Sequence, residues 1–194
     1  MIDASWTPAE LDDPTLGRAV EGGPDAPPLF FPDEAFPPYR FVPGVTPHPS
    51  SHVAGHQHGK PHDAPPFLAA ERWAENHAYL RATDYFNRGW WWEAHEEWED
   101  LWHVVEGRDE SQHTLLKALI QFAACALNLE RGKDRPSARL LGTATDYLRQ
   151  AEALAGSDWL LGLHLPSVAR AAAQHLVPGR DRIEGFVLTP THAR

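Results

Sequence analysis

The 194-residue chain has little of three things: cysteine, basic charge and long apolar runs. Its one cysteine, Cys125, excludes an internal disulfide and is typical of a reducing compartment. Lysine and arginine number 17 against 27 acidic residues, a formal net charge of −10, and such a surface repels phosphate backbones. No apolar run approaches the roughly 20 residues of a membrane span, and the start MIDASWTPAELDD lacks the regions of a signal peptide. We therefore expect a soluble cytoplasmic protein that binds neither nucleic acid nor membrane.

Prolines are abundant in the first third of the chain and scarce after it. Residues 1–66 hold 14 of the 18 prolines, and proline removes a backbone donor and disfavours helix in the residue before it. The stretch LFFPDEAFPPYRFVPG (29–44) carries five aromatic residues, which disordered tails usually lack. The pattern predicts a proline-rich, irregular N-terminal arm over residues 1–66 that packs along a helical body.

From residue 67 onward the apolar spacing is helical. The expected helices run from 67 to 88, from 90 to 106, from Asp109 or Ser111 to about 132, from Pro136 to 155, and from Pro166 to 177. We predict an all-α fold, a multihelical bundle of about five helices over residues 67–180. The segment GFVLT (185–189) is the one stretch with a strand-like pattern, and we assign it to a C-terminal tail, residues 181–194.

A helix–glycine–helix pattern recurs with a period near 43 residues, with Gly89 and Gly132 at equivalent junctions. The first junction, with Phe86, Gly89, Trp91 and Ala94, fits the tetratricopeptide consensus, in which glycine permits the turn and alanine permits close helix packing. The period differs from the 34 residues of that repeat. The sequence therefore predicts hairpins like those of tetratricopeptide repeats, without a true array.

The second expected helix contains most of the candidate catalytic and metal-binding residues, within the stretch RGWWWEAHEEWEDLWH (88–103). At 100° per residue, one broad apolar face forms, as in an amphipathic helix. Its members are Trp91, Ala94, Trp98, Leu101, Trp102 and Val105. We expect Trp91, Trp98 and Trp102 in the core, Trp90 or Trp92 nearer the rim, and Glu97 and Asp100 in water.

The flank of this helix carries His95, Glu99 and His103 at i, i+4 and i+8, with Glu96 beside them. Imidazole and carboxylate groups suit zinc, iron or manganese. The alternative is a hydrogen-bonded helix rim without a ligand. HEEWE is not the HExxH zincin motif, because Glu99 stands where the second histidine should be. The Glu-x-x-His spacing of ferritin-like di-iron sites is also missing.

The third expected helix is apolar over most of its circumference, apart from a stripe of Lys117, Gln121 and Asn128. Since buried polar groups need partners, this stripe should face the glutamate-rich helix. Lys117 would then form a structural ion pair with Glu96 or Glu99, or these groups would surround a small ligand pocket. Gln121 is expected within hydrogen-bonding or bridging-water reach of the same cluster.

A second group of histidines lies in the arm, in TPHPSSHVAGHQHGKPH (46–62). The GHQHG segment could bring His56 and His58 together on a metal, although loop histidines are more often solvated. The dense prolines and glycines suggest a definite path for this loop over the second helix. Cys125, set among alanines, is expected to be an inert core thiol.

The segments FNRGWWWEAHEEWEDLW, KALIQFAACALNLERGK and ARLLGTATDYL together resemble the family known as domain of unknown function 309, over roughly residues 85–155. The matching residues are Phe86, Asn87, Gly89, Glu93, Ala94, His95, Glu96, Glu99, Trp102, Leu119, Ile120 and Gln121. Asn128 departs from the family, which often has histidine there. The resemblance implies a multihelical bundle with no established activity, and it marks Glu93, which the helical wheel places near solvent.

The resulting hypothesis is a polar site between the second and third helices that binds a divalent transition metal such as zinc, or a small polar ligand, with metal-assisted hydrolysis as its chemistry. The candidate residues are Glu96 and Glu99 as catalytic carboxylates, Glu93, Lys117 and Gln121 as ligand-binding groups, and His95, Glu99, His103, His56 and His58 as metal ligands. The alternative is a non-catalytic module that presents an aromatic groove to a protein partner or to a second copy in a homodimer.

Overall fold

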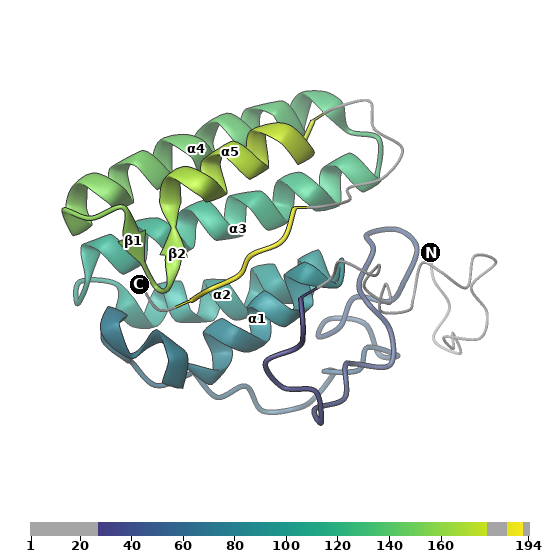
Figure 1. The fold of residues 1–194 in the computed structure, drawn as a ribbon. Helices are drawn as coiled ribbons and strands as arrows, with labels where there is room; N and C mark the ends of the chain where they lie inside the picture. Colours follow the sequence, from purple (N-terminus) through teal and green to yellow (C-terminus); the bar gives the residue numbers. More distant parts are fainter. Residues whose placement is uncertain (1–26, 178–185, 192–194) are drawn as a thin grey trace.

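The computed structural model describes residues 27–177 and 186–191 (Figure 1). In these residues the predicted all-α bundle is confirmed. The helices are the short 3-10 helix η2 (Ala70–Glu75), α1 (His77–Asn87), α2 (Trp91–Val105), α3 (Glu110–Glu130), α4 (Asp134–Ala155) and α5 (Leu165–His175). No helix among the described residues combines the length and the hydropathy that crossing a membrane requires.

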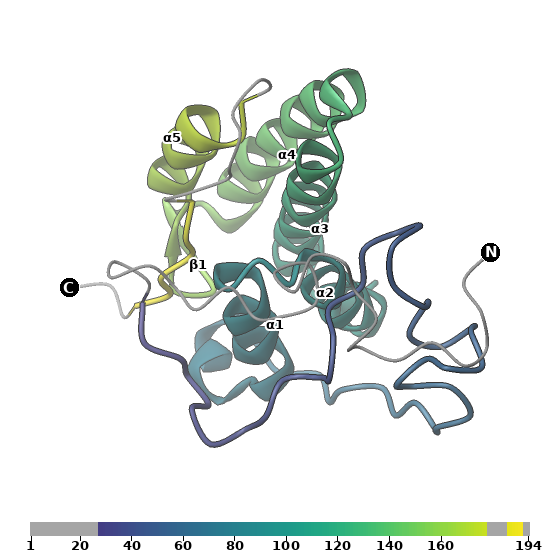
Figure 2. The same ribbon diagram turned by 90° about the vertical axis from the view of Figure 1, so that its right-hand side faces the viewer.

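Helix α3 lies at the centre of the bundle. It packs against α2 on one side and α4 on the other, while α1 covers α2 and α5 contacts α4 (Figures 1 and 2). Its apolar circumference explains this position, because a helix without a broad polar face is stable only when surrounded. Asp109 caps α3 by accepting a hydrogen bond from the Gln112 backbone N–H at 3.0 Å. The expected junctions at Gly89 and Gly132 both have positive φ, 76° and 65°.

The first expected helix, 67–88, is divided in the structure. The Asn76 backbone leaves helical geometry at φ −84° and ψ 94°, and its side chain accepts a hydrogen bond from the Tyr79 backbone N–H. η2 therefore ends before Asn76, and α1 begins after it. The fourth helix begins at Asp134, two residues before Pro136, because proline in the first turn removes no intrahelical hydrogen bond.

The expectation of a body without strands was wrong at one hairpin. The strands β1 (Trp159–Leu160) and β2 (Leu163–His164) pair antiparallel, and the two turn residues, Leu161 and Gly162, have φ of 49° and 73°. Positive φ at both turn positions is the geometry of a tight two-residue hairpin. Two-residue strands are too short to show apolar alternation in a sequence.

The described part of the C-terminal segment, 186–191, is packed into the bundle. Phe186 is buried between Phe86 and Phe122, with ring centroids 5.4 Å from each. The Asn87 side chain accepts a hydrogen bond from the Leu188 N–H and donates one to the Leu188 carbonyl, both at 2.8 Å. This segment, yellow in Figure 1, therefore lies across the helices and belongs to the core. Residues 181–185 and 192–194 of the expected tail lie outside the described residues.

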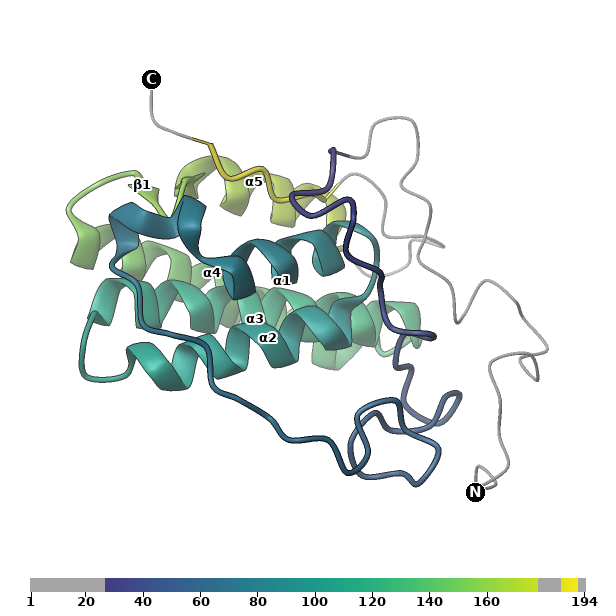
Figure 3. The same cartoon turned by 90° about the horizontal axis from the view of Figure 1, so that it is seen from below.

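The described part of the arm, 27–66, has no helix or strand and contacts α1, α2 and α3 (Figure 3). The backbone N–H groups of Phe30 and Phe31 donate hydrogen bonds to the Asp84 carboxylate at 2.9 and 3.1 Å. Arg40 is buried and forms an ion pair with Glu130 at the end of α3. The arm therefore joins helices that are far apart in the sequence. Residues 1–26 lie outside the described residues.

Candidate functional site

Helix α2 carries the candidate site, and the burial of its tryptophans fixes its orientation. Trp98 is fully buried, as expected, whereas Trp91 and Trp102 are half-buried at the edge of the core. Trp92 lies at the rim, but Trp90 is only 1 % exposed. Trp90 precedes the first helical residue, so the helical wheel does not apply to it. The turn after Gly89 places its ring against Phe36 and Tyr85 in the core.

Glu93 is buried because the arm covers this face of α2. One carboxylate oxygen accepts a hydrogen bond from the Phe41 backbone N–H at 2.7 Å. Burial raises the pKa of Glu93 to about 7, against the lowering effects of the Phe41 N–H and the Arg40 charge. Its other carboxylate oxygen is buried without a hydrogen-bond partner among the described residues. The structure therefore places Glu93 under the arm, and Glu93 is not part of the group formed by His95, Glu96 and Glu99.

Glu97 and Asp100, expected in water, are half-buried beneath the last residues of the arm. His62 in the arm lies with Nε2 2.9 Å from Oδ1 of Asp100. This contact raises the pKa of His62, chiefly through the hydrogen bond to Asp100. The sequence contains no signal for this pair, because no spacing rule links an irregular segment to a helix that lies 38 positions later.

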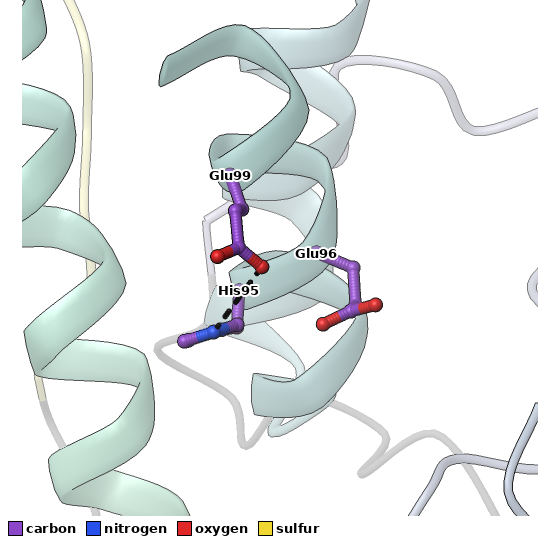
Figure 4. A group of neighbouring side chains, drawn as sticks. All are labelled: His95, Glu96 and Glu99. Carbon is purple, nitrogen blue, oxygen red and sulfur yellow. Dashed lines mark ion pairs between the residues drawn. The ribbon is translucent and has the colours of Figure 1, made fainter. Parts of the chain in front are cut away.

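His95, Glu96 and Glu99 are the residues that the structure brings together (Figure 4). One nitrogen of His95 and one oxygen of each glutamate lie within 4.8 Å of one another. His95 Nε2 is 3.8 Å from a carboxylate oxygen of Glu99, which is longer than a hydrogen bond. Glu96 projects from the neighbouring side of the helix in Figure 4. Three of the four residues of the expected cluster therefore come together through the helical spacing of α2, and His103 does not join them.

His95 is held from the side of α3. Its Nδ1 lies 3.3 Å from the Ile120 carbonyl oxygen, so the ring donates its proton there and leaves Nε2 as the free acceptor facing Glu99. Burial lowers the pKa of His95 more than the nearby Glu99 charge raises it, and the imidazole is neutral at neutral pH. Trp92 stacks on the ring at 5.9 Å, with 16° between the planes. A neutral, oriented imidazole is the form that binds a metal.

The two glutamates repel each other. The surrounding protein removes part of the water from the Glu96 carboxylate, and the charges of Glu99 and Asp100 act against it, so its pKa rises to about 7. Glu96 is nevertheless an exposed residue, and 44 % of the Glu99 side chain is exposed. A cation placed between these carboxylates would relieve the repulsion.

Lys117 does not contact the cluster, contrary to expectation. Within the described residues it forms no ion pair with Glu96 or Glu99, and its ammonium lies 5.7 Å from the ring centre of Trp102 and 5.8 Å from that of Tyr147. The reason is the register of α2 and α3: the Ile120 carbonyl lies beside His95, and Lys117 lies beside Trp102, two turns further along α2. Gln121 is half-buried on α3 and has no hydrogen-bond partner in the described part of the chain.

The other candidate metal ligands lie apart from the cluster. His103 is exposed and contacts Trp102 at 4.7 Å between ring centres. His56 packs edge-on against Tyr39, while the His58 ring is 3.0 Å from the Ser50 carbonyl oxygen. Among the described residues, only His95, Glu96 and Glu99 form a group with metal-ligand spacing.

Comparison with known proteins gives a match to a family model. The family model described as Domain of unknown function (DUF309) matches residues 79–140, from α1 to the first turns of α4. The searches of curated proteins and of solved structures found no match. The matched segment contains the whole of α2 and α3, and with them His95, Glu96, Glu99 and the Ile120 carbonyl. The resemblance seen in the sequence is thereby confirmed: residues 79–140 match the model of the DUF309 family.

Proposed function

We propose that the protein binds one divalent transition-metal ion, such as zinc, on the outer face of α2. The ligands are Nε2 of His95 and one carboxylate oxygen each from Glu96 and Glu99. The observation that carries the proposal is the convergence of these three atoms within 4.8 Å on a solvent-accessible face.

The distances fit a site that tightens around an ion. Ligand atoms of a tetrahedral zinc ion lie about 3.3 Å apart, given bond lengths of about 2.0–2.1 Å. The two glutamate side chains are exposed enough to change rotamer, so a shift of little more than about 1 Å by each would close the site. His95 is already oriented by the Ile120 carbonyl, which reduces the cost of ordering it.

Three protein ligands leave one tetrahedral position for water. Zinc lowers the pKa of a bound water to about 7, which supplies a nucleophile for hydrolysis. A glutamate that accepts the proton of that water would not be a ligand at the same time, so in a hydrolytic site either Glu96 or Glu99 would be the base and the other would stay bound to the ion. The proposal thus extends to metal-assisted hydrolysis at a site that is open to substrate.

The alternative is a non-catalytic interaction module whose hairpins, like those of tetratricopeptide repeats, present an aromatic groove to a partner or to a second copy. That role would favour a closed, fully paired polar network beside an exposed aromatic patch. Among the described residues, the large hydrophobic side chains that are exposed are Phe30, Val53, Leu154 and Trp159, and none of them is on α2. The polar cluster is open, and its His95–Glu99 distance is too long for a hydrogen bond. These observations favour the metal site.

Titration of zinc into chelator-treated protein, followed by isothermal calorimetry, tests this proposal. We expect one site per chain, with affinity reduced by roughly tenfold or more in His95→Ala and in Glu99→Gln. His103→Ala is the matched control, because His103 is an exposed histidine of the same helix outside the cluster. Unchanged binding in His95→Ala, or an equal loss in His103→Ala, would show that the ion binds elsewhere or nonspecifically.

A further inference from the structure

The histidine-rich part of the arm, residues 48–58, forms a closed loop (Figure 3). Its two sides are joined by a backbone hydrogen bond from the Gln57 N–H to the Pro49 carbonyl, at 2.9 Å. At Gly55 the two sides are so close that a Cβ atom would clash with the carbonyl oxygens of His48 and Pro49. The loop is therefore a compact unit with one defined path, and position 55 requires glycine.

Two imidazole rings complete the turns of this loop by accepting hydrogen bonds. Nδ1 of His48 accepts from the backbone N–H groups of Ser50 and Ser51, both at 3.3 Å. Nδ1 of His52 accepts from the Ala54 N–H at 3.1 Å. A backbone N–H can only donate, so both nitrogens need a free lone pair and both rings are neutral in the closed loop. A protonated imidazole carries a proton on each nitrogen and would face these N–H groups as a second donor.

His48 is also packed against aromatic rings. Its ring centre lies 4.9 Å from that of Phe41 in the arm and 5.4 Å from that of Trp92 at the start of α2. The burial that results lowers the pKa of His48. Protonation of His48 therefore has two costs in the closed loop, which are the removal of a charged ring from water and the loss of two backbone hydrogen bonds.

The charged groups around the loop do not outweigh this effect, since the pKa of His48 stays below its ordinary value. The acids at the start of α2 are Glu93, which is bonded to the arm backbone, and Glu96, which is exposed. Within the loop, burial lowers the pKa of His56, and the charge of Lys60 lowers it further. Protonation of the loop is thus opposed from both sides.

The arm is anchored on both sides of the loop by contacts that mild acid leaves in place. Before the loop, the buried Arg40 forms an ion pair with Glu130. After the loop, His62 Nε2 lies 2.9 Å from Asp100, and this hydrogen bond raises the pKa of His62. A falling pH charges His62 and strengthens that pair, so the anchors stay bound while the loop between them loses hydrogen bonds.

We propose that residues 48–58 form a pH-sensitive flap on α2, closed while His48 and His52 are neutral and open once they are protonated. Opening removes the His48 ring from Phe41 and Trp92. The flap goes beyond the proposed metal site and requires no metal.

The direction of the pH dependence follows from His48. Its neutral ring stabilises the closed loop fully above the ordinary imidazole pKa of 6.5. The stabilisation decreases as the pH falls from there through the lower pKa of His48 in the closed loop, because the open chain takes up the proton first.

An NMR titration of the isotope-labelled protein from about pH 8 to about pH 5, the range in which histidines change charge, tests this proposal. We expect the Ser50 and Ser51 amide resonances to shift together with the ring resonances of His48, with a midpoint below 6.5. Amide exchange of Gln57, corrected for its intrinsic pH dependence, should become roughly tenfold faster or more at the acid end, since its hydrogen bond closes the loop.

The double variant His48→Asn/His52→Asn keeps a side-chain acceptor at each turn but cannot be protonated, so its loop should stay closed at acid pH. His58→Asn is the matched control. The His58 ring is 3.0 Å from the Ser50 carbonyl oxygen, to which it donates, so a charged ring still fits there and the variant should open as the parent protein does.

Four results would overturn the flap. They are Ser50 and Ser51 amides that do not titrate with His48, acid opening that persists in the double variant, acid opening that is lost in His58→Asn, and loss of the helical circular dichroism signal over the same pH range. The last would mean that the whole bundle unfolds with the loop. If the double variant is open at every pH, the titration of the parent protein still decides between the two outcomes.

Discussion

Three of the glutamates of α2, Glu93, Glu96 and Glu99, have different surroundings. Glu93 lies beneath the arm with its pKa raised to about 7, Glu96 is open to solvent, and Glu99 faces His95. All three lie in the segment that matches the family model, yet their contacts differ. Glu93 accepts a hydrogen bond from the arm, whereas Glu96 and Glu99 are the two glutamates that we propose as metal ligands.

The single cysteine provides a test at the residue scale. Cys125 is fully buried, its sulfur lies 3.3 Å from the Ser137 carbonyl oxygen, and burial raises the pKa of its thiol to about 12. The thiolate is the reactive form, so native protein should not react with iodoacetamide at mildly alkaline pH, whereas urea-unfolded protein should react fully. Mass spectrometry measures the difference. Rapid labelling of native protein would mean that this part of α3 is accessible.

The tryptophans of α2 provide a second test. Trp98→Ala removes a fully buried side chain and should lower the free energy of unfolding by roughly 3–5 kcal/mol. Trp92→Ala removes a half-buried ring that packs on Phe41 and His48, and it should cost clearly less. Urea denaturation of the two variants compares them. Equal losses of unfolding free energy in the two variants would mean that a different side of α2 faces the core.

At the scale of elements, the helices and the junctions between them could be predicted from the sequence. Features that depend on contacts between residues far apart in the sequence could not. Gly89 and Gly132 mark two helix junctions in both the sequence and the structure, because glycine adopts the positive φ that such turns need. The spacing of His95 and Glu99 is local to one helix, so it could be predicted. The position of Lys117 depends on the register between two helices, which no local pattern encodes.

The hydrogen bonds between Asn87 and Leu188 of the C-terminal segment also join residues that are far apart in the sequence. Asn87→Ala leaves the backbone N–H and C=O of Leu188 without partners, and we expect a loss of about 1–3 kcal/mol in the free energy of unfolding. Amide exchange over residues 186–191 should become faster than in the parent protein. Gln150→Ala, at an exposed position of α4, serves as the control and should change neither quantity. Unchanged exchange in Asn87→Ala would show that the other contacts of the segment, such as the hydrogen bond from the Thr191 N–H to the Gly162 carbonyl, are enough to hold it.

At the scale of the whole molecule, the arm contacts helices that are far apart in the sequence and holds them together. Arg40 donates to the Gly89 carbonyl at 3.2 Å and forms an ion pair with Glu130, so it joins the start of α2 to the end of α3. The aromatic content of residues 29–44 predicts that the arm packs on the body. Its path could not be predicted, since an irregular segment has no periodicity that points to its partner.

Arg40→Ala tests this role of the arm. It leaves the Glu130 charge and a buried carbonyl unpaired, and the free energy of unfolding should fall by about 3 kcal/mol or more. Arg149→Ala removes an exposed ion pair with Asp146, and it should change stability by at most about 1 kcal/mol. Chemical denaturation of both variants gives the comparison. Similar effects would indicate that the arm contributes little to the bundle.

Anomalous diffraction from a zinc-soaked crystal would locate an ion held by His95, Glu96 and Glu99. We expect a single strong peak at the zinc edge about 2.1 Å from His95 Nε2 and from one oxygen of each glutamate, with His95 Nδ1 still facing the Ile120 carbonyl. A peak at the arm histidines instead, or no peak at α2 when zinc is in excess, would show that these three residues do not form a metal site.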